Sequence, residues 1–236
     1  MITVTMKWKE RILLACIVSF VIYALLNILA MVYYPGGTSV EHHRIGYSFF
    51  DNFFSDLGMA RTYAGGSNAV SQFLFASALI LVGAALIIFF MLMVSFFNET
   101  KLERNSSRIG SVAGVLAGLA CIGIAAAPWD LYLNIHLVFV IILSFSLLAV
   151  LISYSIAILS KESYPNRYAW VFGAYALVLV VYIALMMMGL DIETASGLRI
   201  MATGQKIVIY SGMLCLFLQI LGAFFYNKRK DSGYVA

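Results

Sequence analysis

Long apolar stretches without Asp, Glu, Lys or Arg run through most of this chain and separate its short polar segments. Six of them reach the length of about 20 apolar residues that a helix needs to cross a bilayer. Their apolar residues are continuous, whereas the strands of a membrane barrel would alternate apolar and polar residues. The expected spans are residues 12–34, 73–97, 109–127, 133–160, 168–190 and 207–227. The sequence therefore predicts an all-α integral membrane protein, a bundle of six transmembrane helices forming a single domain over residues 1–236.

The composition argues against a soluble protein and against a nucleic-acid-binding protein. Charged residues make up 11% of the chain, compared with about 25% in soluble domains. The net charge is +4, but the basic clusters are too short for a nucleic-acid interface. The first apolar stretch is longer than the ~7–15 residues of a signal-peptide core. No clear small-residue cleavage site follows it, so we expect it to be retained as the first span.

The distribution of Lys and Arg predicts the orientation. Eleven of the fifteen fall at the N-terminus, in the second and fourth connections, and in the tail. These are Lys7, Lys9, Arg11, Lys101, Arg104, Arg108, Lys161, Arg167, Lys228, Arg229 and Lys230. The other four, Arg44, Arg61, Arg199 and Lys206, lie on the opposite side. The positive-inside rule then predicts a multi-pass protein of the cell membrane with both termini in the cytoplasm.

Residues 48–59, in the first outer connection (residues 35–72), have the periodicity of an amphipathic helix. Apolar residues recur on one side at Phe49, Phe50, Phe53, Phe54 and Leu57. Polar residues share this spacing on the other side at Asp51, Asn52, Ser55 and Asp56. The pattern predicts a short interfacial helix whose aromatic face lies in lipid or against the bundle. Its polar face either gathers a functional site at the mouth of the bundle or simply meets water.

Two ionisable residues mark the start of the fourth span. Asp130 follows Pro128 and Trp129, and we favour a role as the N-cap of that helix. His136 lies one to two turns inside the span, where an ionisable side chain usually faces the bundle interior or a wet cavity. His136 is either part of a site or a neutral imidazole hydrogen-bonded to a neighbouring backbone or hydroxyl group.

The third outer connection, residues 191–206, brings basic residues to the start of the sixth span. Arg199, Thr203, Lys206 and Tyr210 are spaced to share one helical face, and Gln205 lies on another. The basic face either neutralises the carboxylates of the first connection, which we favour, or binds an anion such as a lipid phosphate. Arg61 is a candidate for either role.

Small residues at four-residue spacing characterise the third span. Gly110, Gly114 and Gly118 would let neighbouring helix backbones approach closely. This pattern predicts that the third span packs in the centre of the bundle.

Three short motifs together resemble a prokaryotic membrane family. They are Ser55-Asp56-Leu57-Gly58 after the first span, Pro128-Trp129-Asp130 with His136 at the fourth, and Gly204-Gln205-Lys206 entering the sixth. The family is catalogued as domain of unknown function number 998, and the resemblance covers nearly the whole chain. More distantly, the Ser-Asp-x-Gly motif is similar to that of the six-span Frag/DRAM/Sfk membrane proteins. The resemblance implies a six-helix membrane bundle and no established activity. Lys206 stands where we expect Arg, which keeps the charge but loses the planar guanidinium.

Two classes of function follow. In a membrane enzyme acting on a lipid or lipid-linked group at the outer face, Asp56 or Asp51 would be a general base or metal ligand and His136 an acid, base or ligand. Arg199 or Lys206 would anchor an anion. Further binding candidates are Ser55, Arg61, Asp130 and Gln205. In the alternative, a transporter or channel for a small solute or ion, the same residues would form a gate.

The expected partners are membrane lipid and a lipid or small-molecule ligand at the outer face, with no nucleic acid. The chain has no HExxH and no GxSxG motif. We assign no metal site and identify no cofactor or oligomeric state. The site hypothesis makes one structural prediction: Asp56, His136 and either Arg199 or Lys206 converge beneath the first connection.

Overall fold

The structure, a computed structural model, describes the backbone of residues 2–231 and the side chains of residues 8–230. Within this range the chain forms six long α-helices. They are α1 (Ile2–Tyr33), α2 (Ala69–Met93), α3 (Lys101–Ala126), α4 (Trp129–Leu159), α5 (Arg167–Met187) and α6 (Ala195–Asp231). Each is long and apolar enough to cross a membrane. The predicted all-α membrane fold is therefore confirmed.

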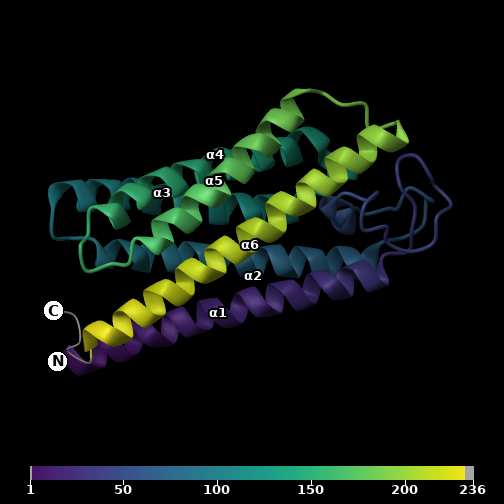
Figure 1. Ribbon diagram of the computed structural model, residues 1–236. Coiled ribbons are helices and arrows are strands. Elements are labelled where there is room, and N and C mark those ends of the chain that lie inside the picture. Colours follow the sequence, from purple (N-terminus) through teal and green to yellow (C-terminus); the bar gives the residue numbers. More distant parts are fainter. Residues whose placement is uncertain (1, 232–236) are drawn as a thin grey trace.

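The helices pack in the order of the sequence. Each contacts the next, and α6 returns to α1, so that the bundle closes into a ring (Figure 1). α1 begins and α6 ends at the same end of the bundle (Figure 1). The long connection between α1 and α2 lies at the opposite end, beside the start of α6 (Figure 1). The three odd-numbered connections therefore gather at the end remote from the start of α1, which we call the outer end after the predicted orientation.

Close packing of α3 depends on its glycines. A Cβ atom on Gly118 would lie 2.5 Å from the carbonyl oxygen of Gly83 on α2, too near for any other residue. One turn earlier, Gly114 makes room for the ring of Phe90. The small-residue stripe thus brings α2 and α3 together, and Gly110 likewise makes room for the ring of Tyr154 on α4. The predicted close approach of the helix backbones is confirmed, but the predicted central position is wrong, because α3 is one member of the ring and packs between α2 and α4.

The third outer connection is shorter than predicted. α6 begins at Ala195, so most of residues 191–206 is helical. Arg199 and Lys206 lower the hydropathy of this segment but leave its backbone hydrogen bonding intact, which is why the apolar pattern alone missed the first turns. At about 1.5 Å per residue, the 37 residues of α6 extend about 55 Å, beyond the ~30 Å hydrocarbon core. The outer turns of α6 can therefore reach the connection between α1 and α2.

Residues 34–68, which we call the cap, fold over the outer end of the bundle. The predicted α-helix over residues 48–59 is wrong: residues 48–52 form turns, and only η1 (Phe54–Gly58) is helical, as a short 3-10 helix. Side chains explain the difference. Asn52 accepts a hydrogen bond from the Ser48 N–H and Asp56 accepts one from the Phe53 N–H, in place of helical carbonyls.

The cap is fixed at several points. Antiparallel bridges join Gly36 to Ile45 and Arg61 to Ser67. Gly36 has a φ of 138°, and a Cβ there would lie 2.1 Å from the Arg44 carbonyl oxygen, so this turn requires glycine. η1 itself contacts α2, α4 and α6. The cap is therefore a packed part of the bundle instead of a helix lying on the membrane surface.

Candidate functional site

Asp56 lies at the centre of the buried polar groups of the cap. Its side chain is 1% exposed, and its Oδ2 accepts hydrogen bonds from Asn52 Nδ2 and the Phe53 N–H, both at 2.9 Å. Among the described residues, Oδ1 has no hydrogen-bond partner of good geometry, and neither has the buried indole N–H of Trp129. The indole is nevertheless near enough to favour the ionised carboxylate. One side of this carboxylate is thus tied into the cap and the other faces α4.

Burial controls the charge of Asp56. Loss of water raises the pKa of this carboxyl group to about 7. The hydrogen bonds from Asn52 and Phe53 and the positive charge of Lys206 oppose the rise without cancelling it. Asp56 therefore changes its charge near neutral pH inside the cap.

Asn52 connects Asp56 to the rest of the cap. It is fully buried, its Oδ1 accepts the Ser48 N–H at 2.9 Å, and its Nδ2 donates to the Gly37 carbonyl oxygen at 2.8 Å as well as to Asp56. The sequence placed Asn52 on a polar helix face and assigned it no role. Its spacing of four residues from Asp56 would also make the two side chains neighbours on a helix, so the pattern could not distinguish this buried hydrogen bond from an exposed polar face.

α6 holds this group from the other side. The Lys206 side chain is 2% exposed, and its Nζ donates to the Asn52 carbonyl oxygen. It also lies over the rings of Tyr47 and Phe49, 5.3 and 5.4 Å from their centroids. One residue earlier, Gln205 Oε1 accepts the Phe54 N–H at 2.5 Å. Adjacent residues of α6 thus bind adjacent parts of the cap.

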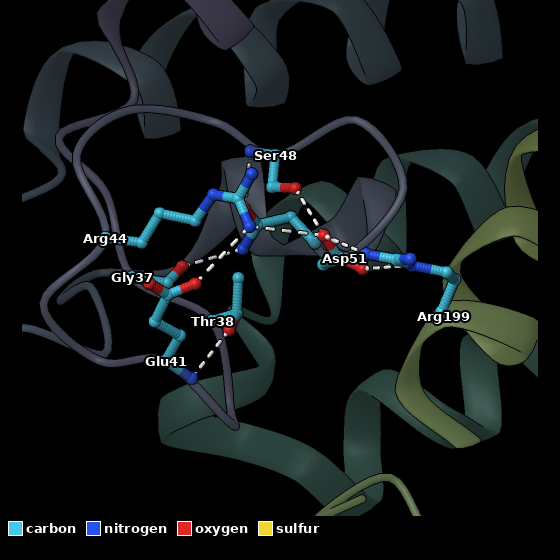
Figure 2. Close-up of polar contacts among 8 residues, drawn as sticks. Gly37, Thr38, Glu41, Arg44, Ser48, Asp51 and Arg199 are labelled. Atoms are coloured by element: carbon cyan, nitrogen blue, oxygen red, sulfur yellow. Dashed lines mark hydrogen bonds and ion pairs between the residues drawn. The ribbon is translucent and has the colours of Figure 1, made fainter. Parts of the chain in front are cut away.

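Asp51 forms a second, more accessible contact with α6 (Figure 2). Its carboxylate accepts hydrogen bonds from Arg199 Nε at 2.8 Å and Arg199 Nη2 at 3.3 Å. Ser48 Oγ donates to it at 2.8 Å and Arg44 Nη1 at 3.3 Å. The hydrogen bond from Arg199 is the main cause that holds the pKa of Asp51 below its ordinary value. The expected ion pairing between the basic face of α6 and the first connection is therefore present at this position.

Asp130 does not cap α4, contrary to our prediction. The N-cap residue is Pro128, without a side-chain hydrogen bond. The Asp130 carboxylate instead accepts the backbone N–H groups of Ala60 and Arg61, at 3.0 Å each. Those donors are 70 and 69 residues away in sequence, which is why a local capping rule misassigned the side chain.

No described hydrogen bond joins the side chains of the remaining candidates to Asp56. His136 is buried, and its Nδ1 is hydrogen-bonded at 2.8 Å to the Ala127 carbonyl oxygen at the junction of α3 and α4. This is the backbone-bonded arrangement that the sequence left open. The Arg61 side chain is exposed and Ser55 is half-buried. The predicted convergence thus holds for Asp56 and Lys206, which Asn52 bridges, whereas the described hydrogen bond of His136 leads away to the backbone.

A groove opens between the outer halves of α5 and α6. Its volume is about 700 Å³. It is lined by Leu177, Val178, Val181, Tyr182, Leu185, Arg199, Ile200, Thr203, Gly204 and Ile207. Arg199, near the start of α6, lies at the outer end, whereas Leu177 and Ile207 lie deeper. The sequence did not predict this groove, because it depends on how far α5 and α6 separate.

Comparisons with family models, with curated proteins and with solved structures gave no match to this chain. The resemblance to the family of unknown function number 998 therefore stays a prediction. Among the described residues, no group of three or more His, Cys, Asp or Glu side chains is arranged to hold a metal ion. The candidate spans indicate a multi-pass membrane protein in contact with membrane lipid.

Proposed function

We propose that this protein binds a phospholipid at its outer face, with an acyl chain in the groove between α5 and α6 and the headgroup phosphate at Arg199. The observation that carries the proposal is the groove itself. It is nearly all apolar along its length, and Arg199 lies at its outer end. Its volume of about 700 Å³ lies within the range of about 300–1,000 Å³ that is typical of ligand sites. Arginine is also the side chain best suited to bind phosphate with two parallel hydrogen bonds.

The proposal includes an orientation. We propose that both termini lie in the cytoplasm, because eleven of the fifteen Lys and Arg residues fall at the N-terminus, in the second and fourth connections and in the tail. The cap and the groove mouth then face the outer leaflet. A lipid would enter the groove sideways, directly from that leaflet.

The site supports binding better than acid–base catalysis. Asp51, the carboxylate next to the groove, is engaged by Arg199, Arg44 and Ser48, and its lowered pKa makes it a weak base. Asp56 has a pKa of about 7, which suits a general base, but it is buried within the cap. Asp56, which is basic enough for this role, is thus enclosed, whereas Asp51, which is more accessible, is too acidic.

Photolabelling tests the proposal. The purified protein would be reconstituted in mixed phosphatidylglycerol–phosphatidylcholine vesicles that contain a phospholipid with a photoreactive acyl chain. We expect labelled peptides from the groove-lining parts of α5 and α6. Val181→Trp fills the groove and should abolish this labelling. Val180→Trp, at an exposed neighbouring position outside the groove lining, is its matched control and should not.

Charge removal tests the headgroup contact. Arg199→Gln should weaken labelling of the groove, because the phosphate loses its partner. Arg61→Gln removes the same charge from an exposed position of the cap and should leave labelling unchanged. Labelling spread evenly over all lipid-facing helices, and insensitive to Val181→Trp and Arg199→Gln, would refute the proposal.

A second candidate is a gate for a small solute or ion. It is supported by the cap, which covers the outer end of the bundle and encloses the ionisable Asp56. Proteoliposomes loaded with a pH-sensitive dye would show a proton flux that Asp56→Asn alters. A flux no greater than that of protein-free liposomes, at every pH between 5 and about 8, the window around the pKa of Asp56, would exclude a proton pathway through this site.

A further inference from the structure

Arg199 takes part both in the groove and in the contact between α6 and the cap. Arg199 lines the groove, and its guanidinium binds Asp51 of the cap, 148 residues earlier in the chain (Figure 2). A guanidinium carries five N–H donors. The described contacts use the Nε hydrogen and one hydrogen of Nη2, all toward Asp51. Asp51 therefore occupies the Nε–Nη2 edge of Arg199, and a headgroup phosphate can take this edge with two parallel hydrogen bonds only if Asp51 leaves it.

The ion pair between Asp51 and Arg199 is suited to exchange. The Arg199 side chain is 65% exposed, whereas that of Asp51 is 13% exposed. Exposed ion pairs contribute little to stability, because water screens them and the long side chain loses freedom. A phosphate that approaches along the groove would meet the exposed side of Arg199 and be repelled by Asp51. The weakness of the ion pair and the repulsion between the phosphate and Asp51 both favour separation of Arg199 from Asp51 when a lipid is bound.

Asp51 keeps other partners if Arg199 leaves. Ser48 Oγ and Arg44 Nη1 still donate to its carboxylate. Arg44 also contacts Glu41 at 3.4 Å, so the cap retains a short run of alternating charges. The cap would therefore not be left with an unpaired carboxylate, and the exchange would leave its interior intact.

The cap is tied to α6 at three neighbouring positions. Asp51 binds Arg199, the Asn52 carbonyl binds Lys206, and the Phe54 N–H binds Gln205. The contact at Arg199 is exposed on the α6 side, whereas Lys206 is buried. Among the described contacts, loss of the Arg199 contact would leave residues 48–51 held to α6 by the Phe49 ring against Lys206 and Tyr210, with Asn52 and Asp56 in place.

We propose, on the basis of the lipid-binding function proposed above, that Arg199 is a latch between the cap and the groove. Asp51 holds Arg199 when the groove is empty, and a phospholipid phosphate takes it when a lipid is bound. Lipid occupancy of the groove therefore loosens residues 48–51 of the cap. The cap therefore responds to the state of a groove that is lined by the same turns of α6 that bind the cap.

The test combines binding with hydrogen exchange. Asp51→Asn removes the competing charge, so the concentration of photoreactive phosphatidylglycerol that half-saturates groove labelling should fall by about two- to five-fold. Glu41→Gln is the matched control: it removes a nearby carboxylate that contacts Arg44 and not Arg199, and it should leave this concentration unchanged. In the wild-type protein, saturating lipid should speed amide exchange of residues 48–51 while α3 exchanges as before.

The outcomes separate the two proposals. If the groove is not labelled in the wild-type protein, the lipid-binding function fails. If the groove is labelled and Arg199→Gln weakens labelling, but Asp51→Asn weakens it as well, Asp51 positions Arg199 and the latch is wrong. Slower or unchanged exchange of residues 48–51 at lipid saturation would overturn the latch independently of any variant.

Discussion

The ammonium group of Lys206 on α6 donates a hydrogen bond to the backbone carbonyl of Asn52 in the cap, across 154 positions of sequence. Both residues are buried. The contact joins the last helix of the bundle to the carboxylate of Asp56, since the amide of Asn52 binds that carboxylate directly. The outer end of the bundle is therefore closed by a polar network that spans the chain, and its members can be tested one by one.

Removal of the Asn52 side chain should destabilise the cap. Asn52→Ala leaves the Ser48 N–H without its described acceptor in a buried site, and it removes one of the two described donors to the Gly37 carbonyl and to Asp56 Oδ2. Losses of this kind cost on the order of 1–3 kcal/mol together. We expect a lower melting temperature in detergent and faster amide exchange in the cap. Asn98→Ala, at an exposed position with one described side-chain hydrogen bond of 3.3 Å, should change neither.

The stability of the protein should depend on the charge of Asp56. The pKa of this group is about 7 in the folded protein, above its ordinary value of 3.8. Between these values the folded state holds a proton that the unfolded state has lost, so this group makes stability fall as pH rises from about 4 to 7 and level off above. At about 1.4 kcal/mol per pKa unit, the loss is on the order of 4 kcal/mol.

Other groups titrate in the same range, so the comparison must be with a variant. Asp56→Asn cannot ionise, and its melting temperature should fall less than that of the wild-type protein between pH 4 and about 8, the range that brackets the two pKa values. The difference between the two curves isolates Asp56. Parallel curves would show that Asp56 keeps one charge state across this range.

The packing of α2 against α3 should not tolerate a side chain at Gly118. The added methyl group of Gly118→Ala would lie 2.5 Å from the Gly83 carbonyl oxygen and 2.6 Å from Ile87 Cγ1. Overpacking of this kind costs about 1–3 kcal/mol, which a thermal melt would detect. Gly173→Ala on α5 meets no atom within 4 Å and should be neutral or stabilising by up to about 1 kcal/mol, because alanine favours the helix. Equal melting temperatures for the two variants would contradict this packing.

The orientation can be measured with single cysteines. The native thiols Cys16, Cys121 and Cys215 are buried and give a low background. Ile45→Cys places a thiol at a cap position that is 94% exposed, and Lys101→Cys places one at an exposed position at the opposite end. A membrane-impermeant maleimide should label Ile45→Cys in intact cells and Lys101→Cys only after permeabilisation. The reverse pattern would invert the proposed topology.

The cap is the part of the fold that the sequence pattern predicted least well. The apolar side of residues 48–59 divides in the structure: Phe54 and Leu57 are buried, whereas Phe49 and Phe50 are exposed. The polar side divides as well, since Asp56 is enclosed whereas the Asp51 side chain stays 13% exposed. Helical spacing predicts only which side chains point the same way from one helix axis. It could not predict a chain that turns at residues 48–52, because the side chains of Asn52 and Asp56 accept hydrogen bonds there in place of helical carbonyls.

The sequence by itself determined the membrane fold and the number of spans. A continuous apolar stretch of about 20 residues has few alternatives, since a bilayer requires every backbone polar group to be satisfied within the helix. Only the tertiary structure decided the burial of Asp56, the bond of Asp130 to the cap, and the sharing of Arg199 between Asp51 and the groove. Each depends on contacts between residues 69 to 154 positions apart, and no local periodicity encodes the distance between two helices.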